Sequence, residues 1–283
     1  MTSPHPAAWL DAVADGRPPA PTVLVLGGFI TSPPVYRRFV RRLRERGAAD
    51  VVVSRVWTTD WLLLARRGFG PILTRSGRAL LEASARSRAV SMGAPVLAVG
   101  HSTGGLLARM LTSPVPYAGR TLNGSGRVGA IVTLGTPHHM PVRAGAWNET
   151  GARAAAFLDV EIPGPWFAPR VGYLSVTSRL AVGRRDGAGR ERGLWRRYAG
   201  LVPEPVEDVI EGDRLVPVPS ALLRGAPSLV LDDAAHGQWP GRDWYGSDRF
   251  LDRWWPLAID AWTAALIARA GTSASGLSGA ASG

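Results

Sequence analysis

A serine between two glycines is the first candidate for chemistry in this chain, because residues 100–104 read Gly-His-Ser-Thr-Gly. The apolar run 95–99 before it predicts a strand, and residues 106–111 after it predict a helix. A strand, a tight turn and a helix would strain the backbone of Ser102 and present its hydroxyl above the edge of a sheet. The chain has 34 glycines, so the pentapeptide alone is weak evidence and partner residues must also be found.

His236 is the candidate base, which a serine needs because its hydroxyl is a weak nucleophile at neutral pH. Of the five histidines, it alone follows a late predicted strand, residues 228–231, and precedes a closing helix. In the chain order serine, acid, histidine, the base occupies this place. We expect the histidine beside the serine, His101, to point away from the line of attack. The remaining histidines are His5, His138 and His139.

Asp213 is the candidate acid that orients the base. It lies between Ser102 and His236 in the segment Gly-Asp-Arg-Leu-Val-Pro, residues 212–217, just past a strand-like region. An ordinary turn or capping aspartate is the alternative interpretation of this residue. The other aspartates considered for the role are Asp186, Asp208, Asp232 and Asp233.

Two backbone amides must face the negative charge that develops on the substrate oxygen. Thr103, directly after the nucleophile, supplies one of them. The loop after the apolar run 22–26 supplies the other, at Phe29. Glycine lets the backbone approach a substrate closely, although a plain glycine turn is the alternative here. The supporting glycines are Gly27, Gly28, Gly100 and Gly104.

Together these pieces resemble the α/β-hydrolase lipases and esterases, and are most similar to the group related to GPI inositol-deacylases and bacterial triacylglycerol lipases. The resemblance spans residues 21–266 and implies a compact α/β-hydrolase fold without the first strands. Many members have His-Gly where this chain has Gly27-Gly28, so a supporting side chain is lost while the backbone donor remains. The segments that carry the resemblance are Leu26-Gly27-Gly28-Phe29, residues 100–104, Leu134-Gly135-Thr136-Pro137-His138, residues 212–217, Ala235-His236-Gly237 and Trp244-Tyr245-Gly246-Ser247.

The order of apolar runs predicts an α/β fold: a doubly wound, mostly parallel sheet with helices on both faces and a cap insertion. Reactive groups would then gather beyond the carboxyl ends of the strands. The predicted strands are residues 22–26, 50–56, 95–99, 128–134, 172–177 and 228–231, and the predicted helices are residues 33–46, 72–92 and 252–270.

The chain divides into an irregular lead-in, one hydrolase domain and a tail. The lead-in is residues 1–20 and the domain is residues 21–270. Residues 142–209 within it contain one clear strand and predict the cap. The arginine-rich stretch 183–197 predicts a mobile exposed loop. Residues 271–283, rich in Gly, Ser and Ala, predict a disordered tail.

Apolar side chains in two regions predict a pocket for an acyl or aryl group, although core packing is the alternative role for each. As a set they favour a small apolar ester or lipid over a sugar or a charged metabolite. The predicted pocket residues are Trp57, Trp61, Phe69, His138, Trp147, Trp166 and Phe167.

The chain is strongly basic, with a net charge of +11. All 33 basic residues are arginines and they are scattered, so we expect no nucleic-acid partner and at most a weak association with an anionic membrane surface. The absence of cysteine excludes disulfides and a cysteine nucleophile. No apolar run is of signal-peptide or membrane-spanning type, which predicts a cytoplasmic protein, peripheral at the membrane if it binds there.

The sequence therefore predicts a serine hydrolase of carboxylic esters, an esterase or lipase. Ser102 would attack, His236 would shuttle the proton and Asp213 would orient the imidazole, with no metal or organic cofactor. Two alternatives stay open: an acyltransferase or thioesterase that uses the same three residues, and a non-catalytic binding protein with the same fold.

Overall fold

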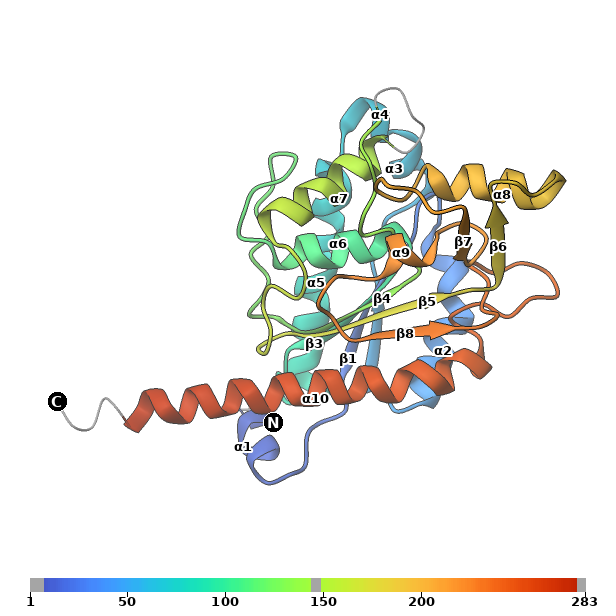
Figure 1. Ribbon diagram of the computed structural model, residues 1–283. Coiled ribbons are helices and arrows are strands. Elements are labelled where there is room, and N and C mark those ends of the chain that lie inside the picture. The colour runs from blue at the N-terminus through green and yellow to red at the C-terminus, as the bar shows by residue number, and fades with distance from the viewer. Residues whose placement is uncertain (1–7, 144–148, 279–283) are drawn as a thin grey trace.

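A six-stranded parallel sheet forms the centre of the protein (Figure 1). The structure is a computed structural model that describes residues 8–143 and 149–278. All neighbouring strands of this sheet pair in parallel, in the order β2-β1-β3-β4-β5-β8, which confirms the predicted architecture. The strands are β1 (Thr22–Leu26), β2 (Asp50–Val53), β3 (Val96–His101), β4 (Val128–Leu134), β5 (Gly172–Ser178) and β8 (Ser228–Leu231).

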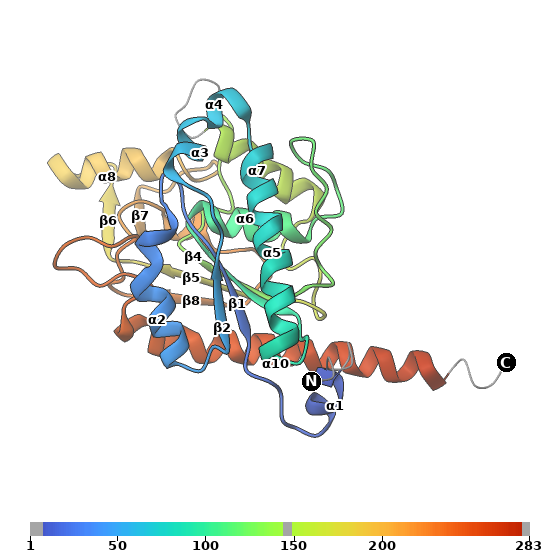
Figure 2. The ribbon, with the colours of Figure 1, turned by 180° about the vertical axis from the view of Figure 1, so that it is seen from behind.

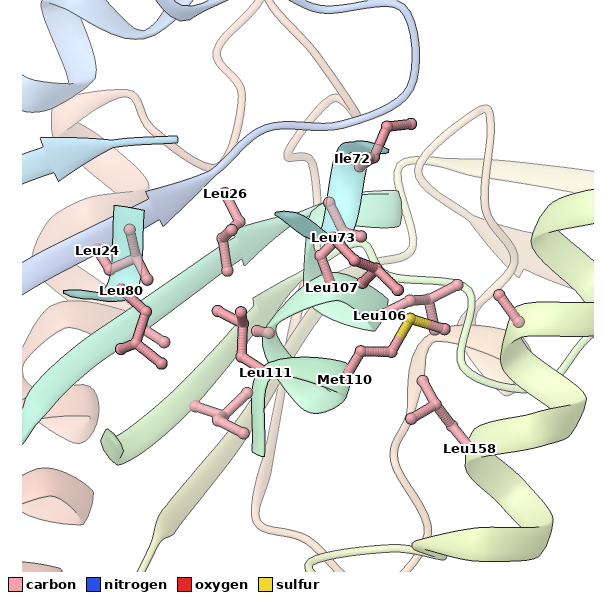
Figure 3. Close-up of a cluster of buried hydrophobic side chains, with 14 of the residues drawn as sticks. Leu24, Leu26, Ile72, Leu73, Leu80, Leu106, Leu107, Met110, Leu111 and Leu158 are labelled. Atoms are coloured by element: carbon pink, nitrogen blue, oxygen red, sulfur yellow. The ribbon is translucent and has the colours of Figure 1, made fainter. Parts of the chain in front are cut away.

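Both faces of the sheet are covered, which is why its strands are continuous apolar runs. Along β1, Leu24 and Leu26 face one core cluster while Val23 and Val25 face the other, as the two-residue repeat of a strand requires. Figure 3 shows the first cluster, where leucines of β1 meet side chains of three helices. These helices are α5 (Gly70–Val90), α6 (Thr103–Thr112) and α7 (Glu149–Glu161).

The opposite face is covered mainly by a long C-terminal helix, α10 (Asp248–Ser278), with α2 (Arg37–Glu45) beside it (Figure 2). Trp254 and Trp262 of α10 are fully buried there. The predicted tail is wrong over residues 271–278, because α10 continues through them; residues 279–283 lie outside the described part.

The N-terminal segment also differs from the prediction. Residues 8–14 form a helix, α1 (Ala8–Ala14), within the predicted irregular lead-in. Trp9 and Val13, four residues apart on one helix face, are buried against α10, which explains the helix. Two buried residues in a seven-residue helix make too short an apolar pattern to be recognised from the sequence.

The prediction of a mobile loop at residues 183–197 is wrong, because these residues include the end of a strand and most of a helix. Strand β6 (Ala181–Arg184) pairs antiparallel with β7 (Val209–Gly212), and α8 (Gly189–Ala199) packs on them (Figure 1). Only Tyr198 of α8 is buried and most of the other residues are charged or glycine, so the helix lacks the apolar periodicity by which it could be predicted. The remaining short helices are the 3₁₀ helix η1 (Pro33–Tyr36), α3 (Thr58–Leu62), α4 (Leu64–Arg67) and α9 (Val218–Ala221).

None of the described helices is long and apolar enough to cross a membrane.

Candidate active site

Ser102 lies on the sharp turn between β3 and α6, at the carboxyl end of the sheet. Its φ of 54° and ψ of −129° fall in a region that side-chain-bearing residues rarely adopt. The amide of Ser102 donates to Leu134 O at 2.8 Å, and Thr136 Oγ1 donates to Ser102 O at 2.8 Å. The turn is thus held from the adjacent strand, β4, and from the loop that follows it.

Two glycines allow the turn to pack. A Cβ atom at Gly104 would overlap the carbonyl oxygen of Leu26 at the end of β1, and a Cβ atom at Gly100 would overlap Gly105 at the start of α6. Both glycines are therefore needed for the close approach of α6 to the strands, as the pentapeptide indicated.

Asp213 and His236 form a buried pair. His236 Nδ1 lies 2.7 Å from Asp213 Oδ2, and the amide of His236 donates to Asp213 O at 3.2 Å. Asp213 is fully buried and His236 is 6% exposed. The other imidazole nitrogen, His236 Nε2, is buried and has no hydrogen-bond partner among the described residues. The ring is thus held through Nδ1 and leaves Nε2 available for proton transfer.

A tight turn after β7 presents Asp213. Its Oδ1 accepts hydrogen bonds from the amides of Leu215 at 3.0 Å and Val216 at 2.7 Å. Arg214, directly after Asp213, has a φ of 79°, and its amide donates to Tyr198 Oη at 2.8 Å. Burial alone would raise the pKa of Asp213, but the imidazole of His236 and these hydrogen bonds lower it below its usual value. Asp213 is therefore held as a carboxylate.

Ser102 and His236 line the same cavity, which has a volume of about 500 Å³. No carboxylate or guanidinium of the described residues lines it. The cavity therefore suits an uncharged group with a large apolar part. Its apolar lining comprises Phe29, Trp61, Leu62, Leu64, Phe69, Pro137, Met140, Leu201, Leu215, Val216 and Trp239.

The loop after β1 lies against the nucleophile. A Cβ atom at Gly28 would be 2.8 Å from Ser102 Cβ, so only glycine fits. Gly28 O accepts from Thr31 Oγ1 at 2.6 Å and from the Thr31 amide at 3.3 Å. The C=O and N–H of a trans peptide point in opposite directions, so the amide of Phe29 points away from Thr31. Neither Phe29 N nor Thr103 N, in the first turn of α6, has a hydrogen-bond partner in the described structure.

The predicted pocket residues divide into two groups. Trp61 and Phe69 line the cavity. Trp57 and Trp166 do not, because both are exposed elsewhere, 45% and 55% respectively. Phe167 packs against the core instead. Trp147 lies outside the described residues.

The prediction for His138 is also wrong. Its ring is fully buried and does not line the cavity, with Nε2 3.1 Å from Thr133 Oγ1 and Nδ1 3.4 Å from Arg109 Nη1. Arg109 in turn donates to Ile162 O at 2.8 Å, at the end of α7. Arg109 therefore joins α6 to α7, and His138 joins Arg109 to β4; neither lines the cavity.

Three polar side chains beside the candidate catalytic residues were not predicted from sequence, and neither were apolar cavity residues such as Met140, Leu201 and Trp239. Tyr245 Oη donates to Asp213 Oδ2 at 2.8 Å. His101 lines the cavity and is not turned away from the site, and Tyr36 lies 2.9 Å from its Nδ1. Tyr245 belongs to the segment 244–247 that carried the resemblance, which was the one available signal.

None of the rival aspartates contacts the ring of His236 among the ion pairs of the described residues. Asp208, Asp232 and Asp233 form exposed ion pairs with Arg185, Arg179 and Arg249, respectively, and Asp186 is exposed. No group of three or more His, Asp or Glu side chains in the described ranges is placed to hold a metal ion.

No protein-family model matches the chain, and no curated protein is similar to it in sequence. Among solved structures, the chain is similar to mature Bacillus licheniformis lipase BlEst2, with a TM-score of 0.54 and 16% identity, over 87% of this chain and 93% of that one. The propeptide form of that lipase matches with a TM-score of 0.55 and 16% identity, over 84% of this chain and 50% of that one. The chain therefore has the α/β-hydrolase fold.

Proposed function

We propose that this protein is a serine hydrolase that cleaves carboxylic esters with an apolar acyl group. One observation carries the proposal: a serine on a strained turn and an Asp-held histidine line one apolar cavity. A histidine held at Nδ1 by a carboxylate and free at Nε2 is prepared to take a proton from a hydroxyl.

The reaction begins when Ser102 Oγ turns toward His236 Nε2, loses its proton to it and attacks the ester carbonyl. The amides of Phe29 and Thr103 donate hydrogen bonds to the oxyanion. Collapse of this intermediate breaks the ester bond, and the leaving alcohol takes the proton from His236. Water then gives a proton to His236 and attacks the acyl carbonyl; the bond from that carbon to Ser102 Oγ breaks, the acid leaves, and Ser102 Oγ takes the proton back from His236. Asp213 keeps Nδ1 protonated and stabilises the imidazolium throughout.

The test compares Ser102→Ala with Ser76→Ala, which removes another buried serine hydroxyl, on α5. We expect Ser102→Ala to abolish hydrolysis of short p-nitrophenyl esters and labelling by a fluorophosphonate, while Ser76→Ala keeps both. A folded wild type that takes no label contradicts the proposal. Addition of an alcohol or thiol acceptor, with product analysis, distinguishes hydrolysis from acyl transfer.

For the partner of this site we propose an anionic lipid surface, bound weakly. Leu62 and Trp239 line the cavity and are 66% and 62% exposed, so apolar side chains surround its mouth. Arg38 and Arg242 line the shallow groove that contains Trp239. Apolar insertion together with basic side chains is the pattern that favours such surfaces.

We expect Ser102→Ala protein, which leaves lipid intact, to sediment with phosphatidylglycerol-containing vesicles at low salt and less at high salt. Leu62→Ser/Trp239→Ser should weaken sedimentation. Equal sedimentation with neutral vesicles, or no effect of the double variant, contradicts this partner.

A further inference from the structure

Tyr36 and His101 form a buried polar chain beside the proposed catalytic residues, although neither takes part in the chemistry described above. Tyr36, at the end of η1, is 1% exposed, and His101, at the end of β3, is 6% exposed. The amide of Gly28 lies 2.9 Å from Tyr36 Oη, which lies 2.9 Å from His101 Nδ1. His101 Nε2 lies 2.7 Å from the backbone oxygen of His236.

The groups at the two ends, the donating amide of Gly28 and the accepting carbonyl of His236, determine the direction of every hydrogen bond. His236 O accepts only, so His101 Nε2 carries a hydrogen. Burial first, and then the neighbouring His236, lowers the pKa of His101 to about 3, so the ring is neutral and Nδ1 is bare. Tyr36 Oη therefore donates to Nδ1. Its own lone pair accepts from the amide of Gly28, and burial raises the pKa of Tyr36, which keeps its proton in place.

We propose that Tyr36 and His101 are positioning residues that hold the oxyanion loop and the histidine loop in one fixed relation to Ser102. At one end the chain holds Gly28, whose peptide bond carries the Phe29 amide. At the other it holds the backbone of His236. Between them, His101 immediately precedes the nucleophile. Each link is a buried hydrogen bond, which is stronger than the same bond in water.

The surrounding rings support this role. The rings of His101 and His236 are 5.1 Å apart between centroids, and Trp244 packs edge-on to His101 at 5.2 Å. His101 therefore also limits the tilt of the His236 imidazole. Because the amide of Gly28 donates to Tyr36, it is not available to an oxyanion, whereas the amide of the next residue, Phe29, is.

This inference rests on the proposed function, so its kinetic test compares the kcat and KM of each variant with those of the wild type. Tyr36→Phe keeps the aromatic ring but removes the hydroxyl, so the hydrogen bonds to Gly28 and His101 are lost. We expect kcat for a p-nitrophenyl ester to fall about tenfold with KM within about twofold, since a misplaced oxyanion donor weakens the transition state more than the substrate complex. Tyr173→Phe is the matched control: it removes another buried hydroxyl, bonded to the Phe167 amide away from the site. It should retain wild-type kcat.

His101→Phe keeps a planar ring and removes both of its hydrogen bonds, so we expect a fall in kcat of about 100-fold. The double variant Tyr36→Phe/His101→Phe should be no slower than His101→Phe alone, because both residues act through the same series of hydrogen bonds and His101→Phe already interrupts it. Additive losses, or Tyr36→Phe with more than half of the wild-type kcat, overturn the proposal.

A second measurement is independent of activity, so it separates this inference from the ester-hydrolase proposal. Nitrogen-15 NMR of labelled histidine should show His101 as the Nε2–H tautomer, unchanged from pH 5 to pH 9. Tyr36→Phe should shift the Nδ1 resonance. A His101 ring that protonates near pH 6, or that carries its hydrogen on Nδ1, overturns the proposed chain even if the enzyme hydrolyses esters.

Discussion

Tyr245 Oη lies 2.8 Å from Asp213 Oδ2, the same carboxylate oxygen that His236 Nδ1 contacts at 2.7 Å. The other oxygen, Oδ1, accepts two backbone amides, so the buried carboxylate receives four hydrogen bonds. This set of donors outweighs burial and keeps the pKa of Asp213 below its usual value. Tyr245 stabilises the charge of the carboxylate and also fixes its orientation, because Oδ2 must face both Tyr245 Oη and His236 Nδ1.

Tyr245→Phe should therefore weaken catalysis. We expect kcat/KM to fall about fivefold at neutral pH, equivalent to about 1 kcal/mol for one lost hydrogen bond. The pKa of Asp213 should rise toward its ordinary value, because one of the hydrogen bonds that lower it is lost, but the group stays a carboxylate at neutral pH. The measurement is kcat/KM at pH 7.5, beside the Tyr173→Phe control. A kcat/KM equal to that of the wild type contradicts this role for Tyr245.

Acid should destabilise the protein through two buried histidines, His101 and His138. Burial is the main cause that lowers the pKa of His101 to about 3 and that of His138 well below 6.5. Below pH 6.5 the unfolded chain binds a proton on each ring and the folded protein does not. The free energy of unfolding therefore falls as the pH falls, by up to about 1.4 kcal/mol per pH unit for each histidine.

Urea unfolding at pH 7.5 and at pH 5 measures this difference. His138→Gln should show a shallower dependence on pH, because one of the two rings is gone. Equal stability of the wild type at the two pH values would contradict the neutral, buried state of both rings.

Gly28→Ala should strongly reduce activity with little change in the overall fold. Its Cβ would lie 2.8 Å from Ser102 Cβ and 3.3 Å from His101 Nδ1, so the loop with the Phe29 amide must move away from the nucleophile. We expect kcat to fall at least about 100-fold. Gly126→Ala is the control, because a Cβ there meets nothing within 4 Å. Near-wild-type activity of Gly28→Ala would show that this loop does not bind the oxyanion.

The sequence predicted the sheet well because each central strand is buried on both faces. Runs such as Thr22–Leu26 and Val128–Leu134 are mostly apolar and contain no charged residue, and the turns that follow them are marked by glycine. The same reasoning failed where burial is slight. In α8, a single buried tyrosine, Tyr198, sits among exposed arginines, so no apolar period appears.

The candidate catalytic residues were predictable because their chain order and their position after strands are local properties. Their supporting residues were not, because the contacts connect distant parts of the chain: Tyr36 reaches His101 from 65 residues away, and His101 reaches His236 from 135. Likewise, Trp57 and Trp61 are four residues apart in sequence, yet only Trp61 reaches the cavity. Which aromatic side chains line a pocket depends on tertiary packing that the sequence pattern does not contain.

Gly151 offers a test of the cavity as an acyl site. It lies in α7 and lines the cavity, and a Cβ there would meet only Met140 Cε, at 3.6 Å. In Gly151→Leu a larger side chain would fill part of the space, so hydrolysis of esters with long acyl groups should fall about tenfold or more while acetate esters are cleaved as before. Stability should hold or rise, since leucine favours a helix more than glycine does.

Gly193→Leu is the matched control, on helix α8, where a Cβ meets nothing within 4 Å. An ester panel of graded acyl length, run on both variants and the wild type, gives the comparison. If both variants show the same dependence of activity on acyl length as the wild type, the acyl group does not lie along α7. The exit toward Leu62 and Trp239, at the exposed end of the same cavity, would then be its binding direction.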